Sequence, residues 1–297
     1  MSSLGDLGHP ELARGVPVPL SPRAALRRGL VWAMGLLLVA ALVGGLVLHG
    51  DARTLVVDGL GLLAVWMSSW VCWLAVWRVG FRYWEVLVSA AAVTSYTAAL
   101  TYLGAVVASG ESVPLPSPAD VPSILFYPLM LAALFVAVRH HLRGLASSVW
   151  LDCAVGSLGA ASVLAVVLSP VRDSATAGPQ SLATVVAVSY PMLDLLLVAA
   201  VAGIAALRGV RMGSRWGLLA VGLMVFAATD VVYALQRTTD TYVVGTPLDV
   251  GWAIGLALIA MWVDGTARSQ RKVTQETRPV RAPWRCRRWP PSRGWGC

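Results

Sequence analysis

Residues 114–139 read PLPSPADVPSILFYPLMLAALFVAVR. Three prolines and Asp120 precede an apolar run whose main interruption is the pair Tyr127-Pro128. Aspartate stabilises the N-terminal end of a helix, and proline is tolerated in the first turn, as at Pro122. The stretch therefore predicts a helix that enters a membrane near Asp120 and is kinked at Pro128.

Two later stretches repeat parts of this pattern. The Tyr-Pro pair returns at Tyr190-Pro191, which predicts a second kink at Pro191, and the Pro-x-Asp-Val opening returns at 247–250. Repeats of paired helices are common in membrane folds. Internal duplication is therefore one interpretation, although the matching segments are short.

The composition indicates a membrane protein. The chain has 297 residues, of which 57% are hydrophobic and 13% are charged, and its mean hydropathy is +0.71. A soluble domain carries about 25% charged residues. We therefore predict an all-α, polytopic membrane helix bundle. The net charge of +8 lies in short loops and the tail, where it sets topology and does not indicate nucleic-acid binding.

The apolar segments predict about eight transmembrane helices, because a bilayer core needs roughly 20 apolar residues per helix. The last segment is the weakest, since it is short and starts at a proline. The chain then divides into a cytoplasmic N-terminal segment (1–28), a membrane domain (29–264) and a basic cytoplasmic tail (265–297). The predicted spans are 29–50, 54–77, 84–109, 119–138, 148–168, 182–207, 216–236 and 246–263.

The basic residues predict the orientation. With the N-terminus inside, 20 of the 23 Arg and Lys residues fall in inner segments and 3 in outer loops. Basic residues favour the cytoplasmic side, so both termini are expected in the cytoplasm and the number of spans is even. Only one of these residues is lysine, a bias typical of GC-rich bacterial coding. We expect the inner (plasma) membrane of a bacterium.

Carboxylates in or beside the spans are the sharpest functional signal, because a charge at the centre of a membrane helix costs roughly 2.5–3.5 kcal/mol or more. Asp58, Asp120 and Asp249 lie in the first turns of spans that begin at the outer face. Their plain interpretation is N-terminal capping. Asp152 and Glu85 begin spans at the inner face and have the same interpretation.

Asp194 and Asp230 lie deeper. Asp194 is about 18 Å from the outer end of its predicted span, and Asp230 about 9 Å, from the helical rise per residue. Tyr190 shares a helix face with Asp194, and Tyr233 shares one with Asp230. These groups are either polar contacts between helices or the wall of a cavity that opens outward.

If the fourth, sixth, seventh and eighth spans pack together, they line one acidic, tyrosine-rich pocket. The kinks at Pro128 and Pro191 would leave free backbone carbonyls beside it. Such a pocket could accept a cation, a proton or a small polar ligand. Its candidate members are Asp120, Tyr127, Tyr190, Asp194, Asp230, Tyr233 and Asp249.

The sequence favours neither a metal site nor a bound cofactor. No cysteine or histidine pair has zinc spacing, and His140-His141 belong more naturally to a basic loop. Walker, G-x-S-x-G and H-E-x-x-H motifs are absent. The lipid bilayer is the expected partner, with an unidentified small ligand or cation at the outer face, and the chain could also pair with a second copy.

Two further features concern packing. Tryptophans at 66, 70, 73 and 77 form a stripe on one helix face, which is more typical of packing or lipid contact than of a cofactor site. Gly251 and Gly255, four residues apart, suit close approach of a neighbouring helix.

The tail changes character along its length. Residues 265–277 are polar and compatible with a linker helix that leaves the membrane. Residues 278–297 read RPVRAPWRCRRWPPSRGWGC, an order that fits no fold. We interpret them as a reading-frame slip or truncation. The alternative is a basic, tryptophan-bearing strip held to anionic lipid.

Six short patterns follow one another in the chain, spread over about residues 30–265. They are P-x-x-A-D ending at 120, F-Y-P-L at 126–129, L-D-x-x-V at 151–155, S-Y-P-M-L-D-L-L-L at 189–197, D-V-V-Y-A-L at 230–235 and P-L-D-x-x-W at 247–252. Together they resemble the multipass N-terminal membrane domain of bacterial cyclic-di-GMP signalling proteins. In those proteins the membrane domain precedes GGDEF (diguanylate cyclase) domains, often with EAL (phosphodiesterase) domains.

The resemblance implies a sensory input domain, in which Asp120, Tyr127, Asp194, Asp230 and Asp249 match recurring positions. It does not specify their ligand. No GGDEF or EAL motif is present, so we expect no enzymatic activity and a chain truncated before its output domain. A small proton- or cation-coupled transporter that uses the same aspartates is the alternative, and a purely structural membrane protein is a third.

Overall fold

A computed structural model describes residues 22–111, 117–141, 214–239 and 241–276, together with single positions and short runs between 155 and 204. Its helices confirm the predicted all-α membrane bundle, because six of them are long and apolar enough to cross a membrane. The helices are α1 (Pro22–Val47), α2 (Asp51–Val79), α3 (Trp84–Ala108), α4 (Asp120–His141), α8 (Ser214–Thr238) and α9 (Pro247–Glu276).

Two of the predicted spans, 148–168 and 182–207, lie largely outside the described residues. Each described position between 155 and 204 is helical. The total of eight spans therefore stays a prediction.

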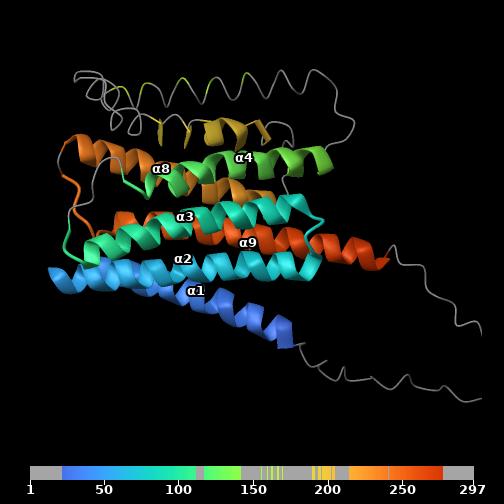
Figure 1. The fold of residues 1–297 in the computed structure, drawn as a ribbon, viewed down its shortest axis with the longest axis horizontal. Coiled ribbons are helices and arrows are strands. Elements are labelled where there is room, and N and C mark those ends of the chain that lie inside the picture. The colour runs from blue at the N-terminus through green and yellow to red at the C-terminus, as the bar shows by residue number, and fades with distance from the viewer. Residues whose placement is uncertain are drawn as a thin grey trace, which may run out of the picture.

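Helix α9 is the central element of the bundle. It packs against α1, α2, α3 and α8, and Figure 1 shows it running between α2 and α8 along the long axis of the molecule. Within its most apolar stretch 72% of the residues are buried, against 22% for α1. The sequence interpretation of the last span as the weakest was wrong, because a short hydrophobic run is sufficient where protein surrounds the helix.

Helix α9 is longer than the predicted span, because it includes most of the linker helix predicted for 265–277. The predicted span ends at 263, at the boundary between membrane domain and tail. The helix continues through that boundary to Glu276 without a break. Hydropathy marks where the apolar residues stop, whereas the backbone hydrogen bonds continue into residues that are themselves compatible with a helix.

Small residues bring α8 and α9 into close contact. A Cβ atom on Gly222 would lie 3.0 Å from the Leu258 Cβ and 3.1 Å from the Gly255 carbonyl oxygen. On α9, a Cβ atom on Gly255 would lie 3.0 Å from the Gly222 oxygen. Close backbone approach is how membrane helices gain packing energy without a hydrophobic driving force. The close approach predicted for Gly251 and Gly255 is confirmed, since Gly251 meets Thr229.

An aromatic core joins α3, α4 and α8. The rings of Phe126 and Phe226 stack with centroids 4.8 Å apart, and Tyr96 meets both rings edge-on, at 5.4 and 4.8 Å. Edge-to-face and offset arrangements are the favoured geometries for such pairs. The neighbouring residue Tyr127 is fully buried beside this core, so its phenol is held in one place.

The predicted tryptophan stripe of α2 divides into two environments. Trp66, Trp70 and Trp77 are exposed on the outside of the bundle, where lipid would contact them. Trp73 instead donates its indole N–H to the Thr94 hydroxyl of α3 over 2.9 Å. The stripe is therefore partly lipid-facing surface and partly a contact between helices.

Candidate functional site

Asp230 is the meeting point of three helices. Tyr127 of α4 donates its phenolic O–H to the Asp230 Oδ2 over 2.9 Å, and Trp252 of α9 donates its indole N–H to Oδ1 over 2.7 Å. Both carboxyl oxygens of this α8 residue thus accept a donor from another helix. A buried carboxyl group needs such donors, because no water replaces them inside a membrane.

The sequence explains why these three residues meet. The glycine contact between Gly222 and Gly255 draws α8 and α9 together, and it lies two turns of α8 before Asp230. Stacking of Phe126 on Phe226 fixes α4 against α8 at the same level. The adjacent Tyr127 then reaches Asp230.

Asp194 has a different environment. It is 1% exposed, and neither of its carboxyl oxygens has a hydrogen-bond partner among the described residues. It lies close enough to Asp230 and Tyr127 to interact electrostatically with both. An isolated carboxylate in such surroundings is costly. The arrangement is therefore suited to a carboxyl group that carries a proton or has a cation beside it.

Asp120 combines a structural contact with a long-range one. Its Oδ2 accepts the backbone N–H of Ser117 over 2.6 Å, which ties down the start of α4 as the capping interpretation predicts. Its Oδ1 accepts the phenolic O–H of Tyr190 over 2.7 Å. Tyr190 therefore bonds across to another helix, although the helical spacing had suggested Asp194 as its neighbour.

Asp249 repeats this arrangement at the start of α9. Its Oδ2 accepts the backbone N–H groups of Gly245 and Thr246 over 2.7 and 2.9 Å, so the predicted cap is confirmed. Its Oδ1 accepts the phenolic O–H of Tyr242 over 2.9 Å. Burial, followed by the Asp249 carboxylate, raises the pKa of the Tyr242 phenol, which therefore remains a donor across the physiological range.

Tyr233 links the two groups through ring contacts. Its ring meets that of Tyr242 edge-on at 4.8 Å and that of Trp252 at 5.4 Å. The polar residues of this end of the bundle are thus continuous from Asp249 to Asp230. We call them the outer cluster, which comprises Asp120, Tyr127, Tyr190, Asp194, Asp230, Tyr233, Tyr242, Asp249 and Trp252.

Of the remaining carboxylates, Asp58 does not act as the predicted cap. Helix α2 starts at Asp51, which places Asp58 two turns inside it. Glu85 lies in the first turn of α3, as predicted, but it is buried there and accepts the Gln270 side-chain N–H over 2.9 Å. Asp152 lies outside the described residues. The cap predicted at Asp58 is misplaced because a sequence determines the ends of a helix only approximately.

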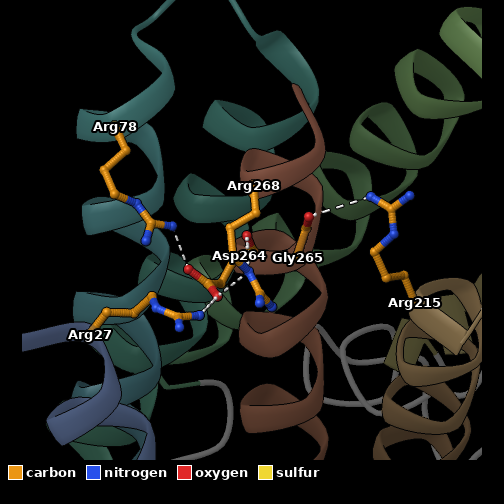
Figure 2. Close-up of polar contacts among 6 residues, drawn as sticks. All are labelled: Arg27, Arg78, Arg215, Asp264, Gly265 and Arg268. Atoms are coloured by element: carbon orange, nitrogen blue, oxygen red, sulfur yellow. Dashed lines mark hydrogen bonds and ion pairs between the residues drawn. The ribbon is translucent and has the colours of Figure 1, made fainter. Parts of the chain in front are cut away.

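A second polar cluster lies at the opposite end of the bundle, and the sequence analysis did not identify it. Figure 2 shows arginines from α1, α2 and α9 converging on Asp264 of α9, while an α8 arginine reaches the Gly265 carbonyl. The Asp264 side chain is only 3% exposed. We call this group the inner cluster, which comprises Arg27, Arg78, Arg215, Asp264 and Arg268.

Three of these partners had signals that sequence reasoning passed over. Trp252 lies one turn after Asp249 and carries the only strong donor that an indole has. Tyr242 belongs to the short connection before α9. Asp264 directly follows the predicted span 246–263. Arg27 lies just before the predicted span 29–50, and Arg78 lies just after the predicted span 54–77, so all three residues are at the same side of the membrane in the predicted topology.

Helix α4 is continuous through Pro128, whereas Pro191 lies outside the described residues. Within the described ranges, no three His, Cys, Asp or Glu side chains gather closely enough to hold a metal ion. The carboxyl, phenol and indole groups of the outer cluster can form hydrogen bonds, and its carboxyl groups can bind a proton or attract a cation.

No protein-family model, no curated protein and no solved structure matches the chain.

Proposed function

We propose that this chain is the membrane-embedded sensory input module of a diguanylate cyclase-type signalling protein. The outer cluster would bind a small polar ligand or cation, and α9 would carry the response to the cytoplasm. In this proposal the chain lies in the inner (plasma) membrane with both termini in the cytoplasm. It recognises and transmits, and it performs no catalysis itself.

The observation that supports the proposal is the course of α9. Trp252 contacts Asp230 in the outer cluster, Asp264 forms the inner cluster, and the helix continues to Glu276. From the rise of a helix, Trp252 and Asp264 are about 18 Å apart along its axis. A rigid helix that joins two polar sites can move one when the other changes.

A ligand would act through the donors of Asp230. A cation or a hydrogen-bonding ligand near Asp194 would compete with Tyr127 and Trp252 for the carboxyl oxygens. A signal arises only if the ligand binds two packings of the bundle with different affinity. Release of Trp252 would supply that difference, because it changes how α9 is held against α8.

The proposal can be tested by fusing residues 1–277 to an intact diguanylate cyclase. We expect Asp230→Asn and Trp252→Phe to change cyclic-di-GMP output, because Asp230→Asn removes one of the two acceptors at this junction and Trp252→Phe removes one of its two donors. Trp73→Phe is the matched control, since it removes an indole hydrogen bond of similar length between α2 and α3. Unchanged output in both test variants, with normal membrane insertion, would refute the sensory role.

A proton- or cation-coupled transporter is the second candidate, and Asp194 favours it. A buried carboxyl group without donors is a setting in which a transported proton or cation could replace them. The transporter predicts ion flux into proteoliposomes that Asp194→Asn abolishes. The sensor predicts binding without flux.

A further inference from the structure

The inner cluster carries more positive charge than its own carboxylate can neutralise. Arg27 and Asp264 form an ion pair at 2.8 Å, Arg78 bonds the other carboxyl oxygen, and the Arg268 Nε lies 3.1 Å from Asp264. Arg215 bonds only the Gly265 carbonyl, at 3.4 Å, among the contacts of the described residues. Three guanidinium groups thus share one carboxylate, and a fourth bonds only a backbone carbonyl.

The surplus guanidinium groups remain open to an additional acceptor. Each guanidinium has five N–H donors, and the contacts of this cluster use only one or two of them. Neither Arg27 nor Arg78 has a buried nitrogen without a partner among the described residues. Their side chains are 18% and 14% exposed, and that of Arg268 is 55% exposed. All three side chains therefore reach the molecular surface.

The position of the cluster points to the headgroup layer. Next to Arg78, the side chains of Trp77, Phe81 and Trp84 are 78%, 62% and 63% exposed. Tryptophan is enriched where a membrane protein crosses from hydrocarbon to headgroups. The arginine-rich end of the bundle is also the cytoplasmic end by the distribution of basic residues, and the cytoplasmic leaflet carries anionic lipid.

We propose that the inner cluster binds the phosphate of an anionic phospholipid headgroup from the cytoplasmic leaflet. Arginine is suited to this role because its planar fork binds phosphate through two parallel hydrogen bonds. Basic sites between membrane helices on the cytoplasmic side bind such headgroups. The phosphate would bridge Arg215 and Arg268, and it would compete with Asp264 for Arg78. This proposal does not depend on the proposed sensory function.

The test uses the full chain in mixed micelles of phosphatidylglycerol and phosphatidylcholine, with the retained lipid counted by native mass spectrometry. We expect the wild-type chain to retain phosphatidylglycerol preferentially. Arg215→Gln and Arg268→Gln should each weaken that preference about fivefold. Both leave the Arg27 and Arg78 ion pairs with Asp264 in place, so the fold is kept. Replacement of each by lysine should lose less, because the charge remains and only the fork is lost.

The matched control is Arg139→Gln. Arg139 is exposed at the end of α4 and stacks on Phe135, so the variant makes the same charge change outside the cluster. An equal loss in this control would overturn the proposal, since general attraction would then explain the preference. Unchanged retention in the Arg215 and Arg268 variants would also overturn it. So would displacement of the lipid by equimolar inorganic phosphate, which would identify a soluble anion as the ligand.

Discussion

Trp252 donates its indole N–H to Asp230, and this 2.7 Å hydrogen bond joins α9, the most buried of the six described helices, to α8. The second carboxyl oxygen of Asp230 accepts the phenolic O–H of Tyr127 from α4. A single carboxyl group therefore joins three helices at one end of the bundle.

The first prediction concerns this bond. Trp252→Phe keeps an aromatic ring but removes the donor, which leaves one oxygen of Asp230 without a partner. We expect a loss of about 1 kcal/mol in the free energy of unfolding, measured by detergent titration in mixed micelles. Trp73→Phe should cost less, because the Thr94 hydroxyl keeps its bond to the Ala90 carbonyl. Equal losses would argue against a special role for Asp230.

The second prediction compares the two deep aspartates. Asp194→Asn replaces a carboxyl group for which the described residues supply no hydrogen-bond donor, so its unfolding free energy should stay within about 0.5 kcal/mol of the wild type or rise. Asp230→Asn replaces one of two engaged acceptors by an NH₂ group, which should cost about 1–3 kcal/mol. The same micelle titration measures both. A larger loss at Asp194 would show that donors are present there.

The third prediction addresses the inner cluster. Asp264→Asn removes the only carboxylate that Arg27, Arg78 and Arg268 share within the described contacts. Removing one side of a buried ion pair leaves the other side uncompensated, so the chain should lose about 2–3 kcal/mol. Glu111→Gln is the control, because Glu111 is exposed just beyond α3 and should have no effect. An unchanged midpoint for Asp264→Asn would mean that water already compensates the arginines.

The fourth prediction uses two glycines of α8. Gly222→Ala would place a Cβ atom 3.0–3.2 Å from α9 atoms, including backbone, so the helices must separate. Such overpacking should lower the free energy of unfolding by about 1–3 kcal/mol. Gly217→Ala meets no atom within 4 Å and should stabilise the helix by up to about 1 kcal/mol. Comparable effects of the two variants on thermal unfolding would refute the close contact.

Helix periodicity predicted which residues share a helix, but it could not predict which helices meet. The capping roles of Asp120 and Asp249 follow from local chemistry, and both are present. The partners of their second oxygens lie elsewhere. Tyr190 is 70 residues from Asp120, and Tyr127 is 103 residues from Asp230. Such pairs depend on the packing order of the spans, which one sequence does not encode in any local pattern.

Hydropathy accounts for the missed inner cluster in a different way. The apolar run ends at 263, so Asp264 was placed at the last position of the predicted membrane domain and was given no partner. The helix continues because its backbone bonds and its arginine partners extend past the apolar stretch. Residues at the edge of a predicted span are therefore the ones that sequence reasoning places least well.

The burial of α9 bears on how the bundle is made. Among the described helices it is the last to be synthesised, yet it occupies the centre and supplies the counter-charge for arginines of α1 and α2. Arg27 and Arg78 are therefore synthesised before the carboxylate that pairs with them. The packing of α1 and α2 around α9 cannot be completed until the residues up to Asp264 have been synthesised.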